Sequence, residues 1–282
     1  MTLALETPPT SVERLLAASY RRVSEVCPAL DAVVPDPGAP RAGDGDGVRG
    51  DELAQQPYAL DAFVTAEADR IRDRHGVVAR RDAAATRALH DYAWSVSLLM
   101  SGVWYLEARV PRVRPEDIRL DLASGTFRIA PGSEFACLAD DPAAALPGAV
   151  PLPQPEALRG ELRSAVADHM GPLLAALAPS TRRGPRALWG LVADDLVSGI
   201  WYLGRMLGQE EAAIRAATAV LPSARGPFPG GADFRRLTGA DGRRHPTRTR
   251  RGCCLFYTVR PAEACVTCPR TSDAERLRRL EA

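Results

Sequence analysis

Residues 81–106, RDAAATRALHDYAWSVSLLMSGVWYL, decide the fold class of this 282-residue chain. They form a helical pattern rich in alanine and leucine, and a second such pattern covers residues 185–207. The end of the first pattern, SGVWYL at 101–106, is matched at five of six positions by SGIWYL at 198–203. We therefore expect two long helices that pack against each other as an internal repeat.

All four tryptophans of the chain lie in these two helices. Large apolar side chains with a polar tip suit either a helical core or a pocket for a bulky ligand. The sequence leaves both interpretations open. If the helices line a pocket, the candidate substrate-binding residues are those of the repeat, Trp104, Tyr105, Trp201 and Tyr202.

Shorter patterns complete a mainly α chain with a small β-hairpin region (α+β). Further helical patterns cover residues 11–26, 61–74, 156–177 and 210–220. Gly171-Pro172 indicates a break within the third of them. Residues 117–130, DIRLDLASGTFRIA, alternate apolar and polar side chains around a Ser-Gly turn, which is typical of a hairpin. Ser272 and Glu275 have capping-box spacing and predict a short final helix.

Shifts in composition divide the chain into five parts. These are an N-terminal helical part with the hairpin (1–139), a linker rich in Pro, Ala and Asp (140–155), a second helical part (156–221), an arginine-rich connector (222–252) and a C-terminal cysteine segment (253–282). We expect the two helical parts to form the body of the protein and the last segment to carry its chemistry.

The charge and the first residues of the chain bear on its location. The net charge is +1, which argues against binding nucleic acid through overall charge. The longest uncharged apolar stretch, 92–106, has 15 residues and is shorter than the ~20 that span a bilayer. The N-terminal twenty residues lack the basic and apolar regions of a secretory signal. These features predict a cytoplasmic protein without a transmembrane segment.

All 36 basic residues are arginine, and neither lysine nor asparagine occurs in the chain. Schiff-base and pyridoxal-phosphate enzymes, Walker-type phosphate loops and protein kinases all need a lysine and are therefore excluded. The sequence also lacks the GxSxG and HExxH motifs and a credible dinucleotide-binding motif. A redox enzyme of this kind would have to take its electrons from another protein.

Four of the six cysteines, Cys253, Cys254, Cys265 and Cys268, fall within 16 residues in the spacing C-C-x10-C-x2-C. Four thiolates can hold a tetrahedral zinc ion or an iron-sulfur cluster. Only the last pair has the CxxC form that structural zinc sites use twice, and adjacent cysteines need a kinked backbone to face one ion. The spacing thus favours a cluster with two irons and leaves zinc open. The other two cysteines, Cys27 and Cys137, stand alone, as buried apolar side chains do.

The cysteine pattern resembles that of the FhuF-like ferric siderophore reductases, in which C-C-x10-C-x2-C binds a [2Fe-2S] cluster. The Cys-Cys-Leu-Phe-Tyr context and Pro269 after the last cysteine are also similar, whereas Val266 stands where the family often has glycine. The resemblance implies that Cys253, Cys254, Cys265 and Cys268 are the cluster ligands. It covers only this short motif.

The resemblance further implies reduction of Fe(III) in a siderophore, of the hydroxamate type, with release of Fe(II) in the cytoplasm. Hard oxygen donors hold Fe(III) better than Fe(II), so a single electron loosens the complex. No catalytic side chain beyond the cluster is required. The implied partners are the ferric siderophore and an external electron donor such as a ferredoxin.

Seven arginines lie between positions 235 and 251, just before the cysteines. They form either a solvated loop or a docking patch for an acidic donor or an anionic part of the substrate. The docking candidates are Arg243, Arg244, Arg248, Arg250 and Arg251. His245 lies among them and is the histidine most worth testing for an effect on the cluster.

Two other interpretations remain open from the sequence. In one, the chain is a non-catalytic interaction protein whose C-terminal segment is held by zinc. In the other, it binds a siderophore, or takes part in siderophore synthesis, and the cluster is only structural.

Overall fold

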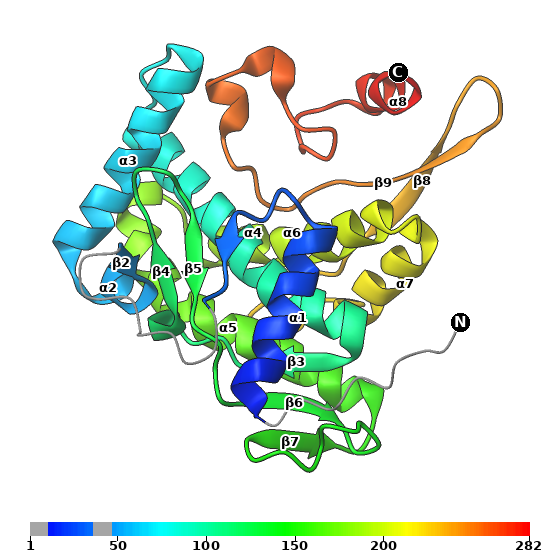
Figure 1. Ribbon diagram of the computed structural model, residues 1–282. Helices are drawn as coiled ribbons and strands as arrows, with labels where there is room; N and C mark the ends of the chain where they lie inside the picture. The colour runs from blue at the N-terminus through cyan, green and yellow to red at the C-terminus, as the bar shows by residue number, and fades with distance from the viewer. Residues whose placement is uncertain (1–10, 36–46) are drawn as a thin grey trace.

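The computed structural model describes residues 11–35 and 47–282. Its centre is a group of three long helices, α4 (Arg81–Glu107), α5 (Pro155–Thr181) and α6 (Pro185–Met206) (Figure 1). The bounds of α4 and α6 agree closely with the two helical patterns of the sequence. The fold is mainly α with small β-sheets, as predicted.

The glycines of the repeat allow close packing, Gly102 of α4 against Val23 and Leu203, and Gly199 of α6 against Leu98. A side chain at Gly102 would clash with Val23 and crowd Leu203, and one at Gly199 would touch Leu98. Glycine in a helix interior costs roughly 0.5–1 kcal/mol relative to alanine, so its use here follows from close packing. The repeat therefore marks the contact between α4 and α6.

Four of the other helices in the described residues pack around this centre, namely α1 (Val12–Val26), α2 (Gly50–Gln55), α3 (Pro57–His75) and α7 (Glu210–Val220). The last helix, α8 (Asp273–Glu281), lies beside the C-terminal hairpin of residues 234–248. The first begins at Ser11, whose side chain accepts a hydrogen bond from the Arg14 amide. The last begins at Ser272, which accepts from the Glu275 amide at 3.3 Å, as its capping-box spacing predicts.

Helix α5 differs from its prediction, because it continues through Gly171-Pro172 and includes Pro179 as well. A proline inside a helix costs about 3 kcal/mol through a lost hydrogen bond and a backbone clash. Leu173, Leu174 and Leu177 are buried on this part of the helix. Their packing against the core offsets the local cost.

In the part of the chain that the structure describes, three small sheets lie around the helices. The first has the order β1 (Ala32–Val33), β5 (Phe127–Ile129), β4 (Ile118–Leu120), β2 (Val48–Arg49); the second has the order β3 (Arg109–Pro111), β6 (Phe135–Leu138), β7 (Ala149–Leu152); and the third pairs β8 (Phe234–Thr238) with β9 (Arg244–Arg248). The predicted hairpin is confirmed by the antiparallel pairing of Leu120 with Phe127.

Two segments expected to be irregular contain strands. The stretch 140–155, expected as a linker, includes β7, which pairs in parallel with β6. The arginine-rich connector forms the antiparallel hairpin β8–β9. The β6–β7 pairing joins strands separated by residues 139–148 and has no tight turn between them. The β8–β9 pairing does have a local signal that the prediction of an irregular connector missed, Asp241-Gly242 in the short connection 239–243.

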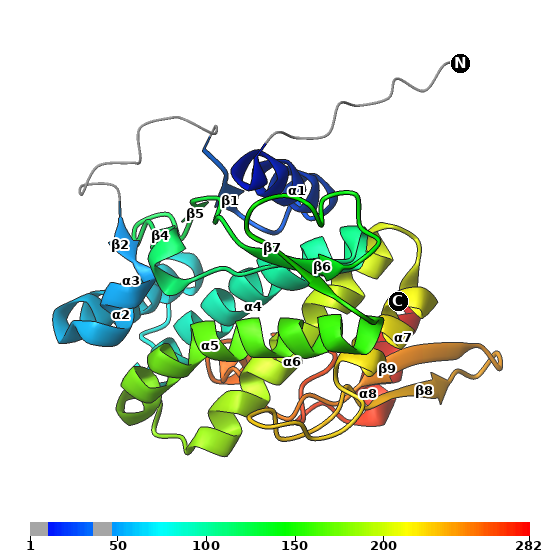
Figure 2. The same cartoon turned by 90° about the horizontal axis from the view of Figure 1, so that it is seen from below.

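One hydrophobic core extends through the body, and Figure 2 shows α4, α5 and α6 between α1 on one side and the C-terminal hairpin on the other. The isolated Cys27 and Cys137 are fully buried in it, as expected. Across 11–35 and 47–282, no helix combines the length and the hydropathy that a bilayer span requires.

Candidate functional site

A buried ion-pair network holds the chain just before the cysteines. Asp194 and Asp195 lie side by side in α6, and both are fully buried. Arg248 Nη2 donates to Asp194 Oδ1 at 2.5 Å, and the Gly252 amide donates to Asp194 Oδ2 at 2.7 Å. Arg250 pairs with Asp195. The strand β9 and the residue preceding Cys253 are thereby fixed to the helical body.

The four clustered cysteines come together in the segment that follows. The Cys253 thiol is within hydrogen-bond reach of Cys268, and Cys265 interacts electrostatically with Cys254 and Cys268. Leu255 has a left-handed backbone with φ of 62°, which turns the chain directly after the adjacent pair. This is the type of bend that two neighbouring cysteines need if both are to face one centre.

Burial differs among the four thiols. Cys254 and Cys268 are buried, Cys253 is half-buried and Cys265 is exposed. Burial raises the pKa of the Cys253 thiol, and a hydrogen bond with the Leu255 backbone opposes this rise. The site thus has one side against the protein and one side open to solvent.

Arg276 of α8 holds the loop between Cys265 and Cys268. Its guanidinium is 1% exposed and donates to three backbone carbonyls, those of Val266 at 2.6 Å, Cys268 at 3.1 Å and Thr271 at 3.3 Å. It also donates to Thr249 Oγ1 at 3.0 Å. Five N–H donors in one planar group allow a single arginine to hold several carbonyls of a tight loop.

The donor set fits a [2Fe-2S] cluster. Four cysteine thiols are a complete ligand set for such a cluster. Arg87 hydrogen-bonds the Cys254 thiol, and Arg250 is close enough to Cys254 and Cys265 to interact with both. These two cations balance part of the negative charge that four thiolates bring together.

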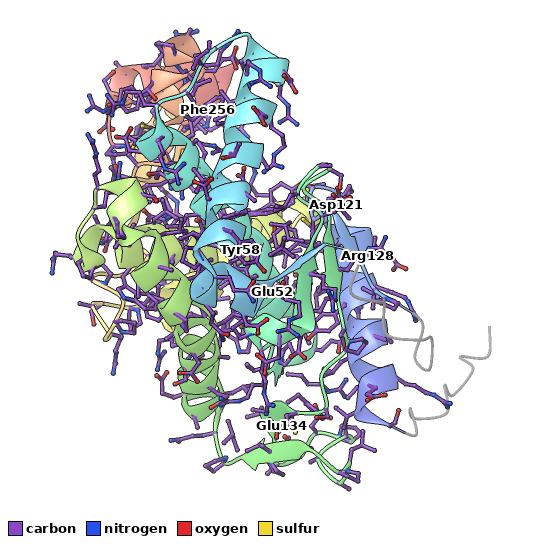
Figure 3. All side chains as sticks on the ribbon, turned by 90° about the vertical axis from the view of Figure 1, so that its left-hand side faces the viewer. Glu52, Tyr58, Asp121, Arg128, Glu134 and Phe256 are labelled. Carbon is purple, nitrogen blue, oxygen red and sulfur yellow. The ribbon has the colours of Figure 1, made fainter. Side chains whose placement is uncertain are left out.

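A cavity of about 590 Å³ lies beside the cysteines, between α3, α4, α6 and the β4–β5 hairpin. The C-terminal cysteine segment contributes Phe256 and Thr267 to its wall, and the connector before it contributes Arg250. Phe256 lies 5.6 Å from the ring of His75 and 5.3 Å from the guanidinium carbon of Arg87. Figure 3 shows Phe256 where the C-terminal segment meets the end of α3.

Only two of the four residues expected to bind substrate lie at the cavity. Trp201 and Tyr202 of α6 line the cavity, whereas Trp104 and Tyr105 of α4 do not. The equivalent aromatic contribution from α4 comes from Trp94, whose ring lies 5.9 Å from that of Tyr202. The repeat identified the two helices but not which of their turns face the cavity.

Three further cavity residues were not singled out from the sequence. Arg87, His90 and Phe256 connect the cavity to the cysteine segment, and His90 Nδ1 lies 2.7 Å from Asp195 Oδ1. The period of α4 would place Arg87, His90 and Trp94 on one face, which was the available signal.

The five arginines expected at a docking surface also differ in their burial. Arg248 and Arg250 are 1% and 7% exposed and pair with aspartates, so the docking prediction is corrected for these two. Arg251 is at the surface, paired with Asp233. Arg243 and Arg244 are exposed at the turn of the β8–β9 hairpin. The positive charge of all five was visible in the sequence, but the pairing of Arg248 and Arg250 with aspartates of α6 was not.

Comparison with known families identifies the cysteine segment. Residues 250–270 match the family model described as the FhuF 2Fe-2S C-terminal domain. No curated protein matches the chain. The match includes all four cysteines of the cluster and the Arg250 that approaches them, and it identifies a [2Fe-2S] cluster as their cofactor. The chain therefore carries an FhuF-type [2Fe-2S] domain in its C-terminal region, consistent with the FhuF-like family.

Proposed function

We propose that this protein reduces Fe(III) held by a siderophore of the hydroxamate class and releases Fe(II) in the cytoplasm. The observation that carries the proposal is the cavity of about 590 Å³, whose wall includes residues of the cysteine segment itself. This volume lies within the roughly 300–1,000 Å³ typical of small-molecule sites. A bulky ligand in the cavity would lie directly beside the cysteines.

The aromatic side chains of the cavity suit a ligand with apolar connecting chains and a polar metal centre. Trp94 and Tyr202 meet edge to face, and the indole N–H of Trp201 is already donated to Glu210 at 2.9 Å. Trp201 therefore offers the cavity its ring and not its donor. These rings would hold the ferric siderophore through nonpolar contact area. The cavity would therefore accept a class of related siderophores.

The reaction places few chemical demands on the protein. The [2Fe-2S] cluster supplies single electrons. Fe(III) gains one electron and becomes Fe(II), and the hydroxamate oxygens that let go of the metal take up protons from water. Fe(II) is bound less tightly by hard oxygen donors, so the complex dissociates. The residues of the chain need only hold the siderophore beside the cysteines.

We also propose that an external protein such as a ferredoxin supplies the electrons. Cys265 is the exposed ligand, and Arg243, Arg244 and Arg251 remain at the surface as cations for an acidic partner. Attraction between exposed charges is screened by salt, so reduction by the donor should slow as ionic strength rises. A rate that does not depend on salt would contradict docking through these arginines.

The main test uses the cluster-loaded protein without oxygen. The dithionite-reduced protein is freed of reductant and mixed with a ferric trihydroxamate, while visible absorption follows the cluster and a chelator specific for Fe(II) traps the product. We expect one Fe(II) for each cluster that is oxidised. A reduced protein that stays reduced with hydroxamate, catecholate and carboxylate complexes alike would refute the proposal.

The Cys265→Ala variant distinguishes reduction from binding. If the proposal holds, this variant loses iron reduction and still binds the siderophore in the cavity. If iron reduction continues at the wild-type rate, the electron does not come through the cluster, and the cluster has only a structural role.

A further inference from the structure

The β8–β9 hairpin and the end of α8 bring together three metal-ligating side chains apart from the four clustered cysteines. These are Asp241, His245 and Glu281, each of which has one ligand atom within 4.8 Å of the other two. His245 Nε2 lies 3.9 Å from Glu281 Oε1. The group is contributed by parts of the chain separated by almost 40 residues, so it exists only because α8 returns to the hairpin (Figure 1).

His245 has an unused nitrogen that faces this group. The residue is 8% exposed, and its Nε2 atom is buried with no hydrogen-bond partner among residues 11–35 and 47–282. A buried polar atom without a partner costs about 1–3 kcal/mol, and such atoms are rare in folded proteins. The Glu281 carboxylate at 3.9 Å is too distant for a hydrogen bond. An ion with ligand bonds of about 2.0–2.2 Å would fit between two atoms at this separation.

Gly239 leaves the space in which the two carboxylates meet. A Cβ atom at this position would lie 2.1 Å from Glu281 Oε1 and 2.9 Å from Asp241 Oδ1. Gly239 is not among the glycines with a left-handed backbone, so its conformation would permit alanine. The two carboxylates can approach each other because position 239 has no side chain.

We propose that Asp241, His245 and Glu281 bind a divalent first-row transition cation. One neutral imidazole and two carboxylates provide a nitrogen, two oxygens and the negative charge that a dication needs, with water in the remaining positions. Imidazole and carboxylate together suit Zn²⁺, Mn²⁺ and Fe²⁺. The ion joins the hairpin to α8, whose Arg276 holds the loop between Cys265 and Cys268, and thereby stabilises that clamp.

The test uses the full chain without an affinity tag, with its cluster loaded and oxidised. The cluster then occupies the cysteines and is silent in electron paramagnetic resonance. Mn²⁺ is the probe, because it prefers oxygen and nitrogen to thiolate. We expect loss of the free Mn²⁺ signal to saturate at one ion per chain, and Zn²⁺ to displace the bound Mn²⁺, as the Irving–Williams order requires.

Four variants connect the ion to these residues. His245→Gln and Glu281→Gln remove ligands and should weaken Mn²⁺ binding roughly tenfold or more. Gly239→Ala keeps every ligand but fills the space between the carboxylates, and it should weaken binding to a similar extent. Glu25→Gln removes an exposed carboxylate on α1 and should bind Mn²⁺ like the wild type.

Two results would overturn the proposal. The first is an Mn²⁺ affinity that is the same in all variants, or the absence of saturable binding of Mn²⁺ or Zn²⁺. In either case, His245 and Glu281 would form a simple ion pair and no metal site. The second concerns the wild type alone, and so does not depend on the folding of any variant. Pulsed electron paramagnetic resonance of the Mn²⁺ complex should show coupling to an imidazole nitrogen, and its absence would exclude His245 as a ligand.

Discussion

Among single residues, Asp194 has the largest part in joining the helical body to the cysteine segment. Its two carboxylate oxygens accept from Arg248 and from the amide of Gly252, next to Cys253. Burial raises the pKa of Asp194, and the Arg248 guanidinium opposes this rise. In this buried ion pair, each charged side chain is stabilised by the opposite charge of the other.

Asp194→Asn should lower the free energy of unfolding by about 3–5 kcal/mol, because it leaves Arg248 buried without its counter-charge. Chemical denaturation at equilibrium measures the loss. Asp61→Asn is the matched control, since it breaks the exposed pair with Arg81 and should cost about 0–1 kcal/mol. Equal losses in the two variants would show that burial does not decide the strength of this pair.

His169 is the residue whose titration should be visible in stability. Its Nδ1 donates to the Val113 carbonyl at 3.0 Å, so Nε2 accepts from the Tyr92 hydroxyl at 2.8 Å and the ring is neutral. Burial lowers the pKa of His169 from 6.5 to about 4.

Between pH 6.5 and about 4, His169 therefore binds a proton in the unfolded chain but stays neutral in the folded chain. The stability is complete above pH 6.5 and falls by about 3 kcal/mol as the pH drops to 4. Denaturation at a series of pH values measures this slope. His169→Gln should flatten it, and an unchanged slope in that variant would assign the acid sensitivity to other groups.

At the scale of elements, α4 and α6 carry the same short sequence and use it differently. Gly199 serves the contact between the two helices, whereas Gly102 lies closest to Val23 of α1 and next to Leu203 of α6. Only the copy in α6 has its aromatic residues on the cavity, and α4 contributes Trp94 from an earlier turn instead.

The two copies provide a matched pair of variants for the cavity. Trp201→Leu should raise KM for the ferric siderophore roughly tenfold, since an aromatic contact is worth about 0.5–1.5 kcal/mol beyond its buried area. Trp104→Leu removes the equivalent ring outside the cavity and should leave KM unchanged. Steady-state kinetics compares them. A larger effect at Trp104 would place the substrate elsewhere.

At the scale of the whole molecule, the protein has a helical body with an apolar core and a C-terminal segment that stands outside that core. Of the described residues, none beyond Phe234 belongs to the main hydrophobic core or packs against it as a partly buried apolar side chain. The segment is held instead by the pairs of Asp194 and Asp195, by Arg276 and by its cysteine ligands.

Removal of the cluster should therefore loosen residues 253–282 without unfolding the body. Hydrogen exchange with mass spectrometry should show loss of protection in peptides from this segment of the cluster-free protein. Peptides from α4 and α6 serve as the internal control and should keep their protection, because their burial does not depend on the cysteines. Unchanged exchange at 253–282 would mean that the arginine contacts alone hold the segment.

Most helices, the hairpin at 117–130 and the set of cluster cysteines could be predicted because their signals are local. Helical periodicity, a Ser-Gly turn and the cysteine spacing each extend over a few neighbouring residues. The parallel pairing of β6 with β7 and the passage of α5 through Pro172 could not, because each depends on packing with residues that are not neighbours in the sequence. The β8–β9 hairpin is different, since the Asp241-Gly242 turn between its strands is a local signal that was missed.

A mainly helical protein with a four-cysteine motif follows from the residues alone, because periodicity and ligand spacing are properties of the linear chain. The tertiary structure decided the rest of the site. It turned Arg248 and Arg250 inward to Asp194 and Asp195, placed Trp201 and not Trp104 on the cavity, and brought Glu281 to His245. Burial, charge pairing and cavity walls depend on which distant residues become neighbours, and only the folded chain specifies that.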